Sequence, residues 1–274
     1  MKMRLKDGKT KVLTLSYDDG VVQDIRLSEI LNRHGIKCTF NINSGMYLAE
    51  EKEREAFRGR LKRLEALALY ADSGHEVAVH AYTHPFLERL DSTEIIYEIT
   101  EDRRDIESTY GTIARGMAYP YGTYNASVID VLKHCGIVYS RTVKSTEKFG
   151  FPENWLELHP TCHHNNPRLM ELAKRFVEVP SKYGNAEMFY LWGHSFEFDT
   201  NDNWDVIERF AEYAGCHEHI WYATNIEIYD YVKAYEALQT SYDKRTVHNP
   251  SAIDVWFEHR GKMYCVKAGE TLKL

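Results

Sequence analysis

The feature that most constrains the fold is an alternation of two patterns along the chain. Short runs rich in β-branched and aromatic residues alternate with longer segments of helical periodicity. This alternation is typical of βα units arranged around a parallel sheet. We predict strands at 12–17, 37–42, 76–79, 115–118, 137–140, 155–158, 188–192 and 219–222.

Start and stop signals for helices lie between these strands. The helix predicted at 24–33 is followed by Gly35, and the helix predicted at 92–110 begins with a capping-box sequence and ends at Gly111. Asn125 is a suitable N-cap for a further helix. The segments between strands are therefore expected to be crossover helices.

Seven to eight strands with intervening helices indicate an α/β chain that forms a (β/α) barrel. An open doubly wound sheet is less favoured, because no GxGxxG or P-loop sequence marks a switch point. We expect this barrel to occupy residues 1–240. The last segment, 241–274, has turn signals between apolar-alternating runs and is predicted to be a small β appendage.

Composition excludes several classes of partner. The chain has 274 residues and a formal net charge of -7, without a long Lys/Arg cluster, so neither nucleic acid nor an anionic membrane is the expected partner. It has no apolar run of about 20 residues, which a membrane span needs. The N-terminus lacks the apolar region of a signal peptide, which favours a cytoplasmic protein unless a leader was trimmed. The oligomeric state is left open.

The five cysteines do not form a recognisable framework. They are widely spaced without a CxxC pair, so we expect buried free thiols rather than disulfides or a thiolate zinc site. They are Cys38, Cys135, Cys162, Cys216 and Cys265.

Acidic and imidazole side chains follow two of the predicted strands. Asp18 and Asp19, in "SYDDG", follow the first strand, and His80 and His84, in "HAYTH", follow the third. The carboxyl ends of barrel strands converge on one face, so these groups should lie together. One carboxylate and two imidazoles make an open site for a divalent metal, which leaves the second carboxylate unliganded.

The spacing of these two histidines is not specific by itself. In a chain with 13 histidines, about 0.6 HxxxH pairs arise by chance. His159 and His163, in "HPTCHH", have the same spacing, and with His164 they are either ordinary loop histidines or part of the pocket rim. The preceding strand and the nearby acidic pair favour His80 and His84 as the ligands.

Two further loops should reach the same face. "AYPYGTYN" follows the fourth strand, and its Pro120 and Gly122 allow a turn that aims a backbone N–H at a developing oxyanion. "LWGHSFEFD" follows the seventh strand, and its His194 is the candidate for a second proton-transfer group.

The motifs "SYDDG", "HAYTH", "YPYG" and "LWGH" occur in an order that resembles the polysaccharide deacetylase family, also called the NodB-homology domain or carbohydrate esterase family 4. The resemblance covers roughly residues 11–232. It implies a distorted (β/α) barrel that removes acetyl groups from N- or O-acetylated carbohydrates. It also implies one divalent metal ion, with Zn expected and Co, Ni or Mn as alternatives.

Residue roles follow from this resemblance by position. It makes Asp18 the general base and His194 the general acid, and it places the backbone N–H of Tyr121 in the oxyanion hole. The metal ligands would be Asp19, His80 and His84. The residues expected around the substrate, an acetylated oligo- or polysaccharide, are Tyr119, Pro120, His163, Trp192 and Tyr222.

The chain departs from the family pattern in two places. The third motif usually begins with an arginine that orients the catalytic aspartate, but Ala118 stands at that position. The fourth motif usually supplies an aspartate near a tryptophan to tune the acid histidine, and only Asn154 and Trp155 align with it. Glu197 or Asp199 could replace that aspartate.

Two other functions stay open at this point. The missing arginine allows a hydrolase of non-sugar amides or cyclic imides on the same scaffold. A non-catalytic carbohydrate-binding homologue is the third reading, although the complete set of aspartates and histidines argues against it.

Overall fold

The computed structural model describes residues 1–50, 52 and 59–274. The helices are α1 (Asp24–Arg33), α2 (Arg63–Tyr70), α3 (Ser92–Tyr110), α4 (Ala126–His134), α5 (Leu169–Glu178), α6 (Phe196–Thr200), α7 (Trp204–Ala214) and α8 (Asn225–Glu236). The strands are β1 (Lys2–Met3), β2 (Lys11–Asp18), β3 (Cys38–Ile42), β4 (Glu76–Val79), β5 (Gly116–Ala118), β6 (Tyr139–Arg141), β7 (Cys162–His163), β8 (Glu187–Gly193), β9 (Ile220–Tyr222), β10 (Gln239–Thr240), β11 (Thr246–His248), β12 (Val255–His259), β13 (Lys262–Val266) and β14 (Thr271–Lys273).

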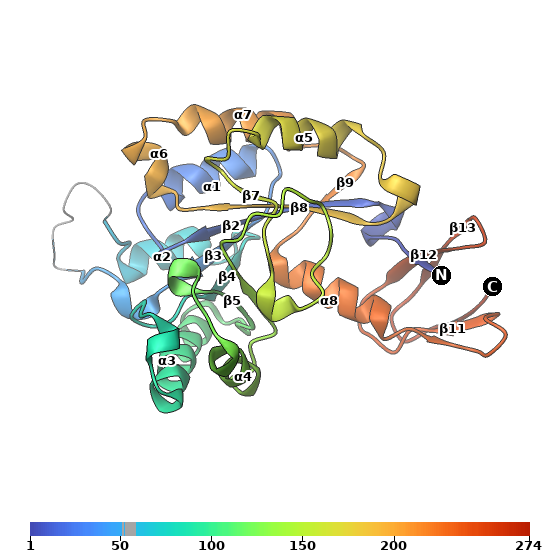
Figure 1. Cartoon of the computed structure of the whole chain (residues 1–274), viewed down its shortest axis with the longest axis horizontal. Coiled ribbons are helices and arrows are strands. Elements are labelled where there is room, and N and C mark those ends of the chain that lie inside the picture. The colour runs from blue at the N-terminus through green and yellow to red at the C-terminus, as the bar shows by residue number, and fades with distance from the viewer. Residues whose placement is uncertain (51, 53–58) are drawn as a thin grey trace.

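A parallel eight-stranded sheet organises the molecule. Its order is β6-β5-β4-β3-β2-β8-β7, and β9 also pairs with β2. In Figure 1, α1, α5 and α7 lie above the sheet, and α3 and α4 lie at the lower left. Buried residues of these helices and of α2 share one hydrophobic cluster with Leu13, Leu15 and Tyr17 of β2, so the helices cover the same face of a curled sheet. This arrangement confirms the predicted fold class, a distorted (β/α) barrel with a small C-terminal β appendage.

Strand β2 is the centre of this sheet, and all of its residues are buried. One of its edges pairs with β8 along most of its length. The other edge is divided, because β9 pairs with the segment from Lys11 to Leu13 and β3 pairs with the segment from Leu15 to Asp18. The carboxyl end of β2 therefore lies between β3 and β8, and the carboxyl end of β9 stops several residues short of it.

The barrel is incomplete between β6 and β7, where we predicted a strand at 155–158. That prediction was wrong. Residues Trp155–Glu157 form a single turn of 3-10 helix, in which the Asn154 side chain accepts a hydrogen bond from the Leu156 N–H at 3.1 Å. This local bond competes with strand pairing, and only Leu158 makes a parallel bridge, to Arg141 of β6.

The predicted helix signals are confirmed in α3 and α4. Asp91 accepts hydrogen bonds from the N–H groups of Thr93 and Glu94 at 2.8 and 2.9 Å, and Gly111 ends α3 with a φ of 63°. The Asn125 side chain caps α4 by accepting from the Val128 N–H at 2.9 Å. These caps fix where the crossover helices begin.

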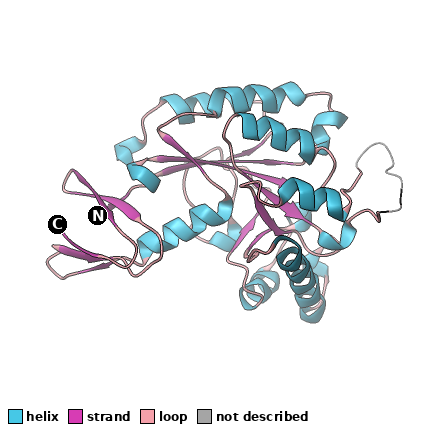
Figure 2. Cartoon of the chain, turned by 180° about the vertical axis from the view of Figure 1, so that it is seen from behind, coloured by secondary structure: helices cyan, strands magenta, loops and turns pink. Residues whose placement is uncertain are grey.

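Two small antiparallel sheets contain the C-terminal segment. Their orders are β1-β12-β13 and β10-β11-β14. Strand β1, from the other end of the chain, pairs with β12, so the two termini lie at the same end of the molecule (Figures 1 and 2). The division into 1–240 and 241–274 stays a prediction, because β1 and β10 belong to the same small sheets as the last strands.

The cysteines are all free, as expected, but they differ in exposure. Cys38 and Cys162 are buried, Cys135 and Cys265 are partly buried, and Cys216 is exposed. Among the helices in the described ranges, none has the length and apolar character needed to cross a membrane.

Candidate active site

Four strand ends bring polar side chains to one edge of the sheet. Asp18 is the last residue of β2, His80 follows β4, Arg141 ends β6, and His194 follows β8. Because parallel strands end at the same edge, residues far apart in the sequence meet there. The sequence predicted three of these four positions, and Arg141 was missed.

Asp19, His80 and His84 form the predicted cluster of metal ligands. One ligand atom from each residue lies within 4.8 Å of the other two, and Asp19 Oδ1 is 3.8 Å from His84 Nε2. The rings of His80 and His84 meet edge to face, with centroids 4.8 Å apart. Asp19 and His84 both have positive φ, at 88° and 59°, so two tight turns direct these side chains toward one point.

His80 is held in an orientation suited to binding a metal. Its Nδ1 lies 2.8 Å from the carbonyl oxygen of Ala118, which fixes the proton on Nδ1 and leaves the Nε2 lone pair free. Burial lowers the pKa of His80 to about 4, so the ring is neutral at physiological pH. An open set of one carboxylate and two neutral imidazoles fits Zn²⁺ and similar divalent ions.

The second carboxylate, Asp18, is engaged by groups other than the cluster of metal ligands. It is 2% exposed, and its Oδ1 accepts a hydrogen bond from Asn41 Nδ2 at 2.9 Å. Its Oδ2 accepts from the guanidinium of Arg141, which is fully buried. Burial works to raise the pKa of Asp18, but the adjacent Arg141 guanidinium outweighs it together with nearby imidazoles and holds the pKa below its usual range. Asp18 is therefore ionised and available to accept a proton.

Arg141 thus supplies the contact that the missing motif-three arginine would make. It approaches Asp18 from the end of β6 rather than from β5, where Ala118 stands, and its guanidinium lies 4.4 Å above the Trp192 ring. A sequence signal did exist, because Arg141 immediately follows the strand predicted at 137–140. The structural strand, Tyr139–Arg141, is shifted by one residue at this end and brings Arg141 to the site.

His194 is a further neighbour of Asp18. Its Nε2 is 3.8 Å from Asp18 Oδ2, and its Nδ1 is 3.0 Å from Glu197 Oε1. Burial alone would lower the pKa of His194, but the hydrogen bond to Glu197 and the charge of Asp18 raise it above its usual value. Of the two carboxylates named as replacements for the motif-four aspartate, Glu197 is therefore the one that contacts His194. Asp199 instead accepts hydrogen bonds from Gln23 and Trp204.

The Tyr121 turn reaches the metal-ligand cluster from the β5 side. Tyr121 has a φ of 58°, and its ring lies edge to face with His84 and stacks on Phe86, with centroid distances of 4.5 and 3.8 Å. Within the described residues its backbone N–H donates no hydrogen bond to another backbone group.

The remaining residues predicted to contact the substrate differ in their distance from the site. The Trp192 ring is 8% exposed and packs beneath Arg141, and Tyr119 is buried with its hydroxyl on the Leu156 carbonyl oxygen at 2.8 Å. Pro120 is also buried. Tyr222 is not brought to the site. It pairs with Leu13, five residues before Asp18 on β2, which is about 16 Å along a strand.

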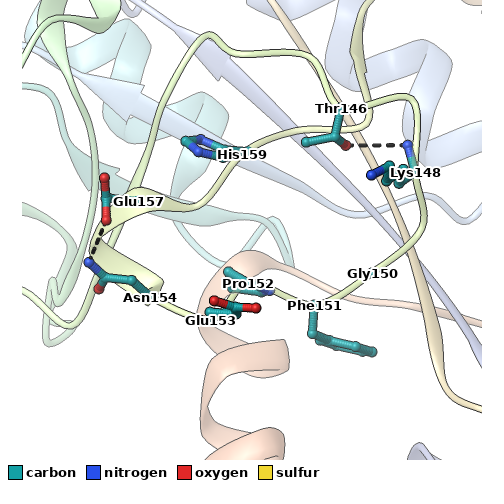
Figure 3. Close-up of a pocket in the computed structure, with 9 residues that line it drawn as sticks. All are labelled: Thr146, Lys148, Gly150, Phe151, Pro152, Glu153, Asn154, Glu157 and His159. Atoms are coloured by element: carbon teal, nitrogen blue, oxygen red, sulfur yellow. Dashed lines mark hydrogen bonds between the residues drawn. The ribbon is translucent and has the colours of Figure 1, made fainter.

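His163 and His164 lie together at a second cluster around Glu197. Their Nε2 atoms are 3.1 and 3.0 Å from Glu197 Oε2. His159, at the same spacing from His163 as His80 from His84, lies elsewhere, with its Nδ1 2.6 Å from Thr142 Oγ1. Figure 3 shows His159 at a pocket of about 350 Å³, which is lined by Thr146, Lys148, Gly150, Phe151, Pro152, Glu153, Asn154, Glu157 and His159.

Residues 5–140 match the family described as polysaccharide deacetylase. A chitooligosaccharide deacetylase of Bradyrhizobium sp. (strain ANU 289) is 29% identical over 133 residues, which are 47% of this chain and 54% of that protein. The peptidoglycan-N-acetylglucosamine deacetylase PgdA of Listeria monocytogenes is 25% identical over 122 residues, 44% of this chain and 23% of that protein. The chain spans about half or less of the length of these curated relatives.

Solved structures share the fold. A Mycobacterium smegmatis protein described as a candidate polysaccharide deacetylase superposes with a TM-score of 0.62 at 17% identity, covering 86% of this chain and 95% of that one. A variant of the peptidoglycan deacetylase PdaC of Bacillus subtilis gives 0.51 at 16% identity, covering 83% and 94%. At these identities the likeness concerns the architecture alone.

Proposed function

Because the chain belongs to the polysaccharide deacetylase family, we propose that it is a metal-dependent hydrolase that removes acetyl groups from an acetylated oligo- or polysaccharide. One observation carries the proposal. Asp18 Oδ2, on a carboxylate whose pKa is held low, lies 3.9 Å from His80 Nε2 in the cluster of metal-binding side chains and 3.8 Å from Nε2 of His194, whose pKa is raised. This proximity supports a base and an acid acting at one metal centre.

Asp19, His80 and His84 would hold the metal. When bound, a divalent ion of this kind polarises an acyl carbonyl and makes a water molecule more acidic. The fit rests on the donor set and on His80, whose Nδ1 contact with Ala118 leaves Nε2 free for coordination. Zn²⁺ is the expected ion for one carboxylate and two imidazoles.

Asp18 is the proposed general base. As the water oxygen bonds to the acetyl carbonyl carbon, Asp18 takes a proton from that water, and its own charge is stabilised by Arg141 and Asn41. The Tyr121 N–H is placed to donate to the carbonyl oxygen as it becomes negative.

His194 is the proposed general acid. Collapse of the tetrahedral centre breaks the bond from the carbonyl carbon to the sugar nitrogen or oxygen, and that leaving atom takes a proton from His194 Nε2. Glu197 at Nδ1 supports the protonated ring that this step requires. The products are acetate and the deacetylated sugar.

Acetate release from a defined panel tests this proposal. The metal-free chain would be reloaded with Zn²⁺ and assayed on N-acetylchitooligosaccharides, peptidoglycan fragments and O-acetylated xylan. We expect release from at least one of them that depends on metal, and the responding substrate separates amide from ester cleavage. Full metal loading without acetate from any of them would contradict the proposal.

The position of Arg141 weighs against the other readings. The case for a hydrolase of non-sugar amides rested on the absent motif-three arginine, and the Arg141–Asp18 pair supplies that contact from another strand. A non-catalytic binding protein has no need of a buried, ionised aspartate beside a histidine whose pKa is raised. Including small amides and cyclic imides in the same panel checks the first alternative directly.

A further inference from the structure

We propose that His163, His164 and Glu197 form a second metal site, specific for a divalent ion such as Zn²⁺ and separate from the cluster of Asp19, His80 and His84. The three ligands come from two elements. His163 is the last residue of β7 and His164 follows it, and Glu197 lies in the first turn of α6. This inference does not depend on the deacetylase proposal.

The distances suit a metal. Glu197 Oε2 is 3.1 Å from His163 Nε2 and 3.0 Å from His164 Nε2, and the three ligand atoms all lie within 4.8 Å of one another. Zinc bonds to nitrogen and oxygen are about 2.0–2.2 Å long, so two ligand atoms at a tetrahedral angle are about 3.3–3.5 Å apart. The two separations from Glu197 Oε2 need only a few tenths of an ångström of adjustment.

One ring nitrogen of His164, Nε2, has no satisfied hydrogen bond within the described part of the chain. Its side chain is fully buried, and its Nε2 lacks a hydrogen-bond partner among the described residues although Glu197 Oε2 is only 3.0 Å away. The distance is short enough for a hydrogen bond, so it is the angle at Nε2 that is unfavourable for one. A metal ion between the three groups would give Nε2 a partner. Without one, a buried nitrogen that has no partner costs free energy of folding.

The outer contacts of His164 are also those of a ligand. Its Nδ1 lies 3.2 Å from the Tyr17 hydroxyl, which can accept the Nδ1 proton and leave Nε2 deprotonated for coordination. His163 and Glu197 are partly open to solvent, with 22% and 23% of their side chains exposed, so an ion can reach the site from that side. Tyr17, the partner of His164 Nδ1, is completely buried, so this contact is shielded from water.

One contact favours the metal-free alternative. The Asn165 N–H donates to His163 Nδ1 at 3.1 Å, which places the His163 proton on Nε2 and directs it toward Glu197. Coordination through Nε2 requires that proton to move to Nδ1 and the Asn165 amide to turn away. The two states therefore differ in metal content, which can be measured without an activity assay.

The test is the zinc content of the full chain after chelation and equilibration with Zn²⁺. We expect two equivalents in the wild type, one in His163→Asn, one in His84→Asn, and none in the double variant. His159→Asn is the matched control, because it makes the same change four residues away from His163, outside both clusters, and should keep two. One equivalent in the wild type with no loss in His163→Asn would overturn the proposal.

The same series separates this proposal from the proposed function. If His84→Asn keeps the wild-type zinc content and His163→Asn loses one equivalent, the second site is supported. The metal site of the deacetylase proposal is then contradicted. Diffraction from wild-type crystals at the zinc edge needs no variant and avoids any folding defect. An anomalous peak between His163, His164 and Glu197 is expected, and a peak at Asp19, His80 and His84 alone would contradict it.

Discussion

The two histidine clusters contain the same kinds of side chain but are built differently. In the first, two of the three groups have separate supports, His80 from the Ala118 carbonyl and Asp19 from Arg60. In the second, one carboxylate, Glu197, is shared by the imidazoles of His163, His164 and His194. A cluster with independent supports can bind a ligand without disturbing its neighbours. A cluster built on one shared carboxylate ties any ligand it binds to His194.

The comparison also shows what sequence spacing does and does not predict. His80 and His84 have the same spacing as His159 and His163, yet only the first pair converges. His80 directly follows β4, and a sharp turn at His84 returns that ring to it. His159 lies between a 3-10 turn and β7 and contacts Thr142 instead.

Replacing the base should give the largest effect. Asp18→Asn is expected to lower the rate constant for acetate release by about 10²–10⁴-fold, because an amide cannot take the proton from water. Metal content should be unchanged, since Asp18 is engaged by Arg141 and Asn41 and is not among the metal ligands. Measuring both on one preparation separates the roles of the two adjacent aspartates. A variant with wild-type turnover would remove Asp18 from the mechanism.

Arg141→Met should show how strongly the first site depends on its buried ion pair. Removing the guanidinium leaves the Asp18 charge buried and unpaired, which costs about 3–5 kcal/mol in free energy of unfolding. The urea midpoint is the measurement.

The matched control for this variant is Arg115→Met. Arg115 pairs with Asp230 at 2.6 Å, with each side chain 33% exposed, so its loss should cost about 0–1 kcal/mol. The double variant Asp18→Asn/Arg141→Met should recover part of the stability lost in Arg141→Met. Equal losses in the two single arginine variants would show that Asp18 is solvated and that the pair is unimportant.

Glu197→Gln tests the shared carboxylate through the pH profile. Glu197 raises the pKa of His194, so its loss should lower that pKa. The acid must be protonated to act, and kcat/KM falls as pH rises through its pKa, so this limb should move to lower pH in the variant. Asp199→Asn is the control, because Asp199 contacts Gln23 and Trp204 instead of His194. A limb that moves equally in both variants would remove Glu197 from this role.

His159→Asn should have the smallest effect. His159 belongs to neither cluster, and its contact with Thr142 is a single hydrogen bond, worth about 1 kcal/mol or less. Its pH profile should match that of the wild type. A large loss of acetate release in this variant would place His159, and the pocket of Figure 3, in contact with substrate.

Much of the fold could be predicted because its strands and helix caps are local signals. The central strands at 12–17, 37–42 and 76–79 lie where the apolar runs predicted them, and Asn125 begins α4 as its side chain suggested. The segment 155–158 could not be predicted, because a single Asn154 side-chain bond turns an apolar run into a 3-10 helix.

Site residues that directly follow a strand could be predicted from the sequence. Residues whose distance from the site depends on the pairing register between strands could be predicted less well. Arg141 could have been found by the same rule as Asp18, and Glu197 lies one helical turn after His194. Tyr222 also ends a strand, but β9 pairs with the beginning of β2, so its end stops far from Asp18. That offset depends on the pairing between strands distant in sequence, which local patterns do not contain.

The pairing of β1 with β12 has a consequence for the order of events during translation. Lys2 and Met3 are synthesised before their partners, Glu258 and Phe257, which follow about 255 residues later. At about 5–20 residues per second, the first strand waits about 10–50 s for its partner. The strands of the parallel sheet, which all lie between β1 and β12 in the sequence, can therefore assemble while β1 is still unpaired.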